Sequence, residues 1–306
     1  MNIAKKATVG SYFAAFAFIL GMVGGSVLWG TKECILPEMA AMAVAMWAYR
    51  DPNWLRDPLN ICLAPSLTSV IGFTVNQLHL VYLAKVGLTF ILIMLVLRLI
   101  RSNFAPSLAT GLLPLITDAH DWTLVLLIFS FTFVFMLAVI RFRWHRPLQP
   151  KVHSPSKNTW MFLLLLFLWL GVCGLTGFER LAVIPTVIVV IYESIQKPDY
   201  TGKTAFKQGI ALTVSATVGT LLFYAIDAWL LVTLLDIVLM LLLQLLMKVR
   251  MPAIYAFPLL PFLFPDDIVP QLPLGTLCAC LFLFALAAVY KKYDASAAAK
   301  STGVSV

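Results

Sequence analysis

The chain alternates between apolar runs and short breaks that are charged or rich in proline and glycine. Most of the runs are close to the length of about 20 residues that a helix needs to cross a bilayer. The second, fifth, eighth and eleventh runs are shorter and carry prolines, which is typical of broken or re-entrant segments. The twelve runs cover residues 11–30, 33–49, 61–78, 80–100, 103–117, 122–140, 159–177, 180–194, 207–226, 228–247, 252–265 and 272–290. They predict an all-α, polytopic membrane protein with about twelve transmembrane helices.

Composition supports the membrane prediction. The chain is 61% hydrophobic and 12% charged, with a mean hydropathy of +0.93, whereas soluble domains average about 45–50% apolar and about 25% charged residues. So few charges cannot cover a water-facing surface, which excludes an ordinary soluble enzyme, a disordered protein and a nucleic-acid binder. The cysteines and histidines lack metal-ligand spacing, and the chain contains no phosphate-binding loop and no hydrolase motif. We therefore expect no enzymatic activity, no cofactor and no metal.

The positions of the charges predict an orientation. If the N-terminus is cytoplasmic and all twelve runs cross, every Lys and Arg except Lys32, Lys85 and Arg180 lies on the cytoplasmic side. The positive-inside rule favours this arrangement. If the fifth run dipped into the membrane and returned on the same side, the basic loop 141–157 would be external, which the same rule disfavours. We therefore predict a multi-pass protein of a bacterial-type cytoplasmic membrane with both termini in the cytoplasm. The external turns would then be acidic, with Glu33, Asp118, Asp121, Glu179, Asp227, Asp266 and Asp267.

An internal repeat divides the chain. The pattern A-x-x-L-L-P occurs at 109–114 and again at 256–261, an offset of 147 residues, and Ser69–Gly72 has a counterpart in Ala216–Gly219. Six spans per half is an even number, so the two halves would share one orientation. The alternative is a chance alignment of apolar sequence. The predicted units are a first repeat (1–140), a basic cytoplasmic linker (141–158), a second repeat (159–293) and a cytoplasmic tail (294–306).

Ionisable residues inside predicted spans are candidate functional groups, because a charge in the hydrocarbon region is costly. Asp236 and Lys85 lie in the corresponding tenth and fourth spans at similar predicted depths. We expect them to form a pair, either as a proton-coupling carboxylate with an anion contact or as a structural buried ion pair. Glu38, one turn inside the second span, is either a vestibule residue or an interfacial one.

Hydroxyls and prolines give further candidates for a substrate or ion pathway. Ser69 and Thr217 lie on corresponding spans and suit a polar solute, although such hydroxyls also serve as helix–helix hydrogen bonders. Pro106 and Pro252 begin the short fifth and eleventh segments. Paired, proline-interrupted segments in two halves are a sequence indication of a transporter's binding site, and the alternative is that they are packed kinks.

The proline-bearing segments resemble the HPP family of integral membrane proteins. The resemblance rests on the Leu-Pro-Glu-Met-Ala-Ala stretch at 36–41, the basic, proline-containing loop at 51–58, a Ser/Gly helix and the Leu-Leu-Pro segment. The His-Pro-Pro that names the family is replaced by Phe-Ala-Pro at 104–106 and Arg-Met-Pro at 250–252. This resemblance implies a small-anion transporter of the nitrite type. The six-helix units with basic ends are also similar to the fusaric-acid-resistance and aromatic-acid-exporter type, which implies an organic-acid exporter.

These observations predict a secondary transporter of a small anion or organic acid, with proton coupling as one mechanism. The expected partners are membrane lipid, the transported solute, and either a second copy of the chain or a partner membrane subunit; nucleic acid is not expected. The alternative function is a non-transporting membrane scaffold or subunit of a cell-envelope or transport complex. The basic linker would then be its docking surface.

Overall fold

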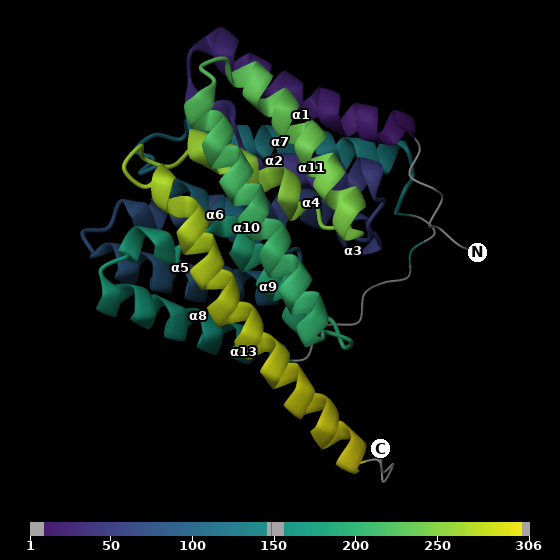
Figure 1. Ribbon diagram of the computed structural model, residues 1–306, viewed down its shortest axis with the longest axis vertical. Helices are drawn as coiled ribbons and strands as arrows, with labels where there is room; N and C mark the ends of the chain where they lie inside the picture. The colour runs from purple at the N-terminus through teal and green to yellow at the C-terminus, as the bar shows by residue number, and fades with distance from the viewer. Residues whose placement is uncertain (1–8, 146–147, 149–155, 302–306) are drawn as a thin grey trace.

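The computed structural model describes residues 9–145, 148 and 156–301, and these form a bundle of helices (Figure 1). No β-strand occurs among these residues. The all-α fold class is therefore confirmed. Residues 1–8, 146–147, 149–155 and 302–306 lie outside the described residues. Half of the predicted linker, the N-terminal lysines and the end of the predicted tail fall there.

Eight helices in the described part of the chain are long and apolar enough to cross a membrane. Their outward faces carry exposed leucines such as Leu28, Leu175 and Leu246, which suit contact with lipid acyl chains. The polytopic membrane character is thus confirmed. The eight are α1 (Val9–Trp29), α4 (Pro58–Asn76), α5 (Tyr82–Leu99), α7 (Thr123–Arg141), α8 (Ser156–Thr176), α10 (Gly202–Ala225), α11 (Trp229–Met247) and α13 (Leu272–Ser301).

Four shorter helical segments correspond to the short, proline-bearing runs. They are α2 (Pro37–Ala43), which continues as a π-helical turn (Val44–Ala48), α6 (Pro106–Ile116), α9 (Pro185–Gln196), and α12 (Ala253–Ala256), which continues as the 3₁₀ helix η4 (Phe257–Phe262). Even the 12 residues of α9 rise only about 18 Å, against a hydrocarbon core of about 30 Å. The described residues therefore support eight helices of spanning length rather than twelve, and the crossing of the short segments stays a prediction.

Proline sets where the short helices begin. Pro37, Pro106 and Pro185 each occupy the first helical position of their helix, where a missing N–H costs nothing because it has no intrahelical acceptor. Extended residues precede two of these starts: Leu36 before α2 and Ile184 before α9. The chain therefore reaches the interior in an extended form before helix begins.

The short helices form the core of the bundle. Every residue of α2, α6, α12 and η4 is buried, and so is nearly all of α9. α2 packs on α12 and α6 packs on α9, so short helices from the two halves of the chain contact each other. The long helices surround them, and α13 extends beyond the rest of the bundle (Figure 1).

Glycines allow two close crossings between a long and a short helix. A Cβ atom on Gly72 of α4 would lie 1.9 Å from the carbonyl oxygen of Gly111 on α6. A Cβ atom on Gly219 of α10 would lie 2.4 Å from the Cα of Pro258 on η4. Only glycine fits at either position, because a side chain would overlap backbone that cannot rotate away.

The remaining elements lie at the two ends of the bundle. η1 (Lys32–Cys34), η3 (Glu179–Ala182) and η5 (Val269–Gln271) lie at one end, and α3 (Pro52–Leu55) lies at the other. At the first end Arg180 lies 4.0 Å from Asp267 and Asn76 donates to Asp118. We call this the acidic end; the helices alternate in direction, so their other termini lie at the opposite, basic end.

At the basic end Gln244 joins the two halves of the chain. Its Nε2 donates to the Tyr12 hydroxyl, 3.0 Å away, and its Oε1 accepts from the hydroxyls of Tyr49 and Tyr255. The Arg50 guanidinium lies over the ring of Trp144, 3.3 Å from its centroid. The cationic residues at this end include Arg50, Arg56, Arg98, Arg101, Arg141, Arg143, Lys197, Lys203, Lys248 and Arg250.

Candidate functional site: two cavities along the short helices

A cavity of about 30 Å³ lies where the four short helical segments meet. We call it the central cavity. One face of α9 lines it, with Thr186, Val189, Val190 and Glu193 at the i, i+3, i+4, i+7 spacing of a helix face. Small residues on the other three segments leave the space: Ala41, Ala109, Ala253 and Ala256. A volume of this size holds one or two water molecules, since a water needs about 10–15 Å³ of such space.

Glu38 lies in the first turn of α2 and faces this cavity. Its side chain is 5% exposed, and neither carboxyl oxygen has a hydrogen-bond partner among the described residues. An ionised carboxylate without a partner is costly in an apolar interior. Because Glu38 is buried at the centre of the bundle, its position fits a vestibule residue better than an interfacial one.

A second carboxyl lies toward the basic end of the same cavity. Glu193 is half-buried on α9, and its Oε1 accepts a hydrogen bond of 2.8 Å from the indole nitrogen of Trp54 on α3. Thr186 and Glu193 are two helical turns apart, so the cavity wall on α9 extends about 10 Å. The central cavity therefore runs from Glu38 and Thr186 toward the basic end.

Pro106 and Pro252 both line the central cavity, at the starts of α6 and α12. The two prolines thus line the same cavity. Ser69 and Thr217 do not line either cavity. The Ser69 hydroxyl donates to the Ser66 carbonyl and the Thr217 hydroxyl donates to the Thr213 carbonyl, so each bonds to its own helix.

A larger cavity of about 560 Å³ opens at the acidic end. We call it the acidic-end cavity. Its wall includes Lys85 of α5 and Arg180 of η3, one from each half of the chain, together with Asp118 and Glu179. A volume of this size falls in the range of about 300–1,000 Å³ that small-molecule sites occupy.

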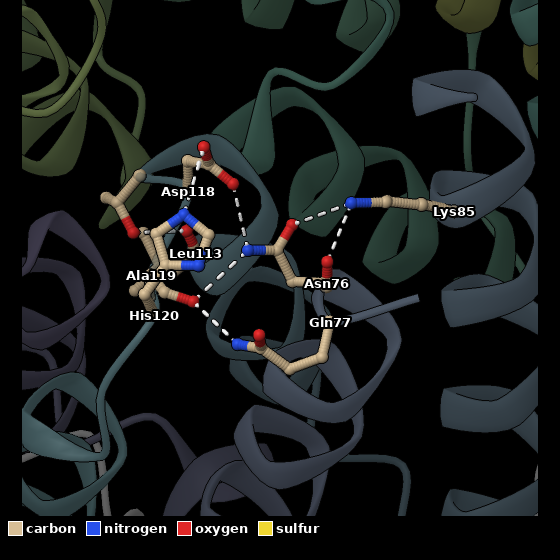
Figure 2. Close-up of polar contacts among 8 residues, drawn as sticks. Asn76, Gln77, Lys85, Leu113, Asp118, Ala119 and His120 are labelled. Carbon is tan, nitrogen blue, oxygen red and sulfur yellow. Dashed lines mark hydrogen bonds and ion pairs between the residues drawn. The ribbon is translucent and has the colours of Figure 1, made fainter. Parts of the chain in front are cut away.

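Lys85 is held at the mouth of this cavity by neutral groups. Its Nζ donates to the carbonyl oxygen of Asn76 at 2.7 Å and lies 3.5 Å from that residue's side-chain oxygen (Figure 2). The amide nitrogen of Asn76 donates in turn to Asp118 and to the carbonyl of Ala119, which also accepts from Gln77. Within the described residues Lys85 forms no ion pair, so its charge remains available to an anion.

The expected pair of Lys85 with Asp236 is wrong. Lys85 lies in the first turn of α5, which packs against α4, α6, α8 and η3, whereas α11 packs against α1, α10, α12 and η4. Both oxygens of Asp236 are buried and have no hydrogen-bond partner among the described residues. Similar predicted depth did not bring the side chains together, because the two helices are on different sides of the bundle.

Sequence reasoning missed the roles of Glu193, Trp54, Thr186 and Arg180 in these cavities. The spacing of polar and small residues on α9 is the signal that could have identified Thr186 and Glu193 as one face of a buried helix. The contact of Trp54 with Glu193 joins residues far apart in the chain and leaves no local pattern. In the described part of the chain no group of His, Cys, Asp and Glu is arranged to hold a metal ion.

Comparison of the chain with family models, with curated proteins and with solved structures gives no match in any of the three.

Proposed function

We propose that the protein is a secondary transporter of a small anion or organic acid. The observation that carries the proposal is that α6, and the stretch of chain that runs from α12 through η4 to Pro265, line both cavities. α6 contributes Pro106 and Ala109 to the central cavity and Leu115 and Ile116 to the acidic-end cavity. From Ala109 to Leu115 a helix rises about 9 Å. A short apolar barrier thus separates the central cavity from the acidic-end cavity, as alternating access requires.

We further propose that all twelve segments link the two ends and that the halves are repeats in the same orientation. Several structural features recur at the offset of 147 residues. Gly30 and Gly177 both have positive φ, at 66° and 77°, and the left-handed residue Arg101 (φ 53°) has its counterpart in Lys248 (φ 52°). The two close crossings, Gly72 on Gly111 and Gly219 on Pro258, also keep this spacing.

The acidic-end cavity supports an anionic solute. Lys85 has no acidic partner among the described residues. The Arg180 side chain is 60% exposed, and its guanidinium lies 4.0 Å from the carboxylate of Asp267. Asp118 and Glu179 lie on the same wall, so the two cations offer an anion direct charge-assisted hydrogen bonds rather than a net positive field. The size of this cavity suits an organic acid, whereas the central cavity holds only water or a proton in this conformation. A scaffold has no need for either cavity, which is why we place that alternative second.

The basic end gives the proposed orientation. Arginines and lysines gather there, and acidic residues gather at the other end. By the positive-inside rule the basic end faces the cytoplasm of a bacterial-type cell membrane. The central cavity then lies on the cytoplasmic side of the acidic-end cavity, and the acidic-end cavity opens toward the outside.

A flux screen with purified protein in proteoliposomes tests the proposal. Radiolabelled carboxylic acids and small inorganic anions are offered with and without a pH gradient. We expect saturable uptake of one class, with a raised half-saturation concentration in Lys85→Gln and Arg180→Gln. Lys32→Gln is the matched control, because Lys32 is a cation at the same end that does not line the cavity. If no solute enters faster than in empty vesicles, the transporter proposal fails and the scaffold function takes its place.

A further inference from the structure

We propose that Glu38 carries the coupling proton, which it exchanges with the basic end through the central cavity by way of Glu193. This inference rests on the proposed transport function. It also places the coupling proton on a different carboxyl from Asp236, which the sequence offered either as the coupling group or as part of a structural pair. Glu38 lines a cavity with both oxygens unpartnered among the described residues, whereas Asp236 lines neither cavity.

The surroundings of Glu38 contain no cation to hold it as a carboxylate. α1 has no charged residue in its described helix, and its Tyr12 hydroxyl is bonded to Gln244. α6, α12 and η4 likewise carry no charged residue, and Tyr255 is also bonded to Gln244. The only charge on α7 is Arg141 at its end, and in the described structure the other titratable group of the cavity is Glu193.

The chemistry of the lining favours a proton over a metal ion. Hard cations such as Ca²⁺ take about 6–8 oxygen ligands. The side chains that line the central cavity offer oxygen from three residues only, namely Glu38, Thr186 and Glu193. A space of about 30 Å³ also leaves no room for a hydrated ion. One or two waters, however, fit between the two carboxyls and can relay a proton.

The transfer is balanced as a simple proton relay. The O–H bond of protonated Glu193 breaks and gives its proton to a cavity water, while another proton of that water forms the O–H bond of Glu38. Glu193 then regains a proton from the water at the basic end. Trp54, which donates to Glu193, helps to stabilise the carboxylate that forms transiently on that residue.

Protonation of Glu38 also gives a reason for a conformational change. With the proton bound, the side chain is neutral and the tight packing of α2 on α12 is compatible with burial. Without it, the carboxylate needs water, so the conformation that opens the central cavity to the basic end is favoured. The proton thereby biases which end of the protein is open.

Three variants in proteoliposomes test the assignment. Glu38→Gln keeps the shape of the side chain but cannot exchange a proton, so we expect solute counterflow to persist while accumulation driven by the pH gradient is lost. Glu193→Gln should slow proton entry from the basic end, read with a pH dye in the lumen, without abolishing accumulation. Asp236→Asn is the matched control, a buried and unpartnered carboxyl among the described residues that lies outside the cavities, and it should keep accumulation. Accumulation that survives in Glu38→Gln, or is lost in Asp236→Asn alone, overturns the assignment.

A second measurement separates this inference from the transporter proposal. In pH-difference infrared spectra of the reconstituted protein, a carboxyl that exchanges protons gives a C=O band that appears and disappears with pH. We expect one such band to be missing in Glu38→Gln and present in Asp236→Asn, whether or not a transported solute has been found. If the spectra of wild type and Glu38→Gln are the same, Glu38 does not exchange protons and the inference is wrong.

Discussion

Replacing Gly72 with alanine tests the closest helix crossing in the structure. The new Cβ would lie 1.9 Å from the carbonyl oxygen of Gly111 and 3.3 Å from Cδ of Pro114. Close carbon–oxygen contacts between backbones are about 3.3–3.6 Å, so α4 and α6 would have to separate by about 1.4 Å. α6 is buried along its whole length, which leaves it no direction in which to move without disturbing another neighbour.

The expected cost follows from this overlap. Overpacking a well-packed interior costs about 1–3 kcal/mol. Alanine in place of glycine within a helix gains up to about 1 kcal/mol of helix propensity, so a glycine with open space around it should gain stability on the same change. Gly21 of α1 is such a position, because a Cβ atom there would have no packing neighbour within 4 Å. Both glycines lie within helices, so the propensity gain cancels in the comparison, and Gly72→Ala should be less stable than Gly21→Ala by the overpacking cost of about 1–3 kcal/mol.

The measurement is the unfolding midpoint of the detergent-solubilised protein, followed by circular dichroism. Thiol labelling of Cys62, which is buried on α4, gives a second, local readout of the same interface. Gly219→Ala should behave like Gly72→Ala, because its Cβ would lie 2.4 Å from Pro258. If Gly72→Ala and Gly21→Ala unfold at the same midpoint, the close packing of α4 on α6 is refuted.

The remaining predictions concern the core and the basic end. Ala109→Leu should fill the central cavity and abolish solute flux while the helix content by circular dichroism is retained, and Ala17→Leu on an exposed face of α1 should leave flux unchanged. Gln244→Leu should lower the free energy of unfolding by about 1–3 kcal/mol, because three tyrosine hydroxyls lose their partner. Trp54→Phe should slow proton entry in the lumenal dye assay, since Glu193 loses its indole donor; unchanged entry would contradict the role of that contact.

The helices were predictable because their causes are local. Apolar runs bounded by charge and proline marked every long helix in the described chain. The predicted short runs began at residues 33, 103 and 180, a few residues before the prolines at which α2, α6 and α9 start. The lengths of the short segments were predicted less well. The mostly apolar stretch 33–49 is 17 residues long and was predicted as one span. Part of it is extended chain and part a π-helical turn, so the regular helix α2 is only 7 residues long.

The candidate site was only partly predictable. Glu38, Pro106 and Pro252 were found from their rarity or from the repeat, and all three line the central cavity. The pairing of Lys85 with Asp236 failed, because depth along a helix does not reveal which helices are neighbours. That information lies in contacts such as α2 on α12 and α6 on α9, which join segments far apart in the chain.

In the two-repeat arrangement that we propose, the halves share packing residues but differ in charge. Glu38 follows Pro37 as Thr186 follows Pro185, so a symmetric protein would have two carboxyls at this point of the central cavity. Two such carboxyls on the wall of one small, largely apolar cavity would compete for ionisation, and one of them would be favoured to stay protonated. A hydroxyl in the second half removes that competition and leaves Glu38 free to gain and lose its proton. The difference between the halves is therefore what allows one site to cycle, while the shared packing keeps the surrounding helices alike.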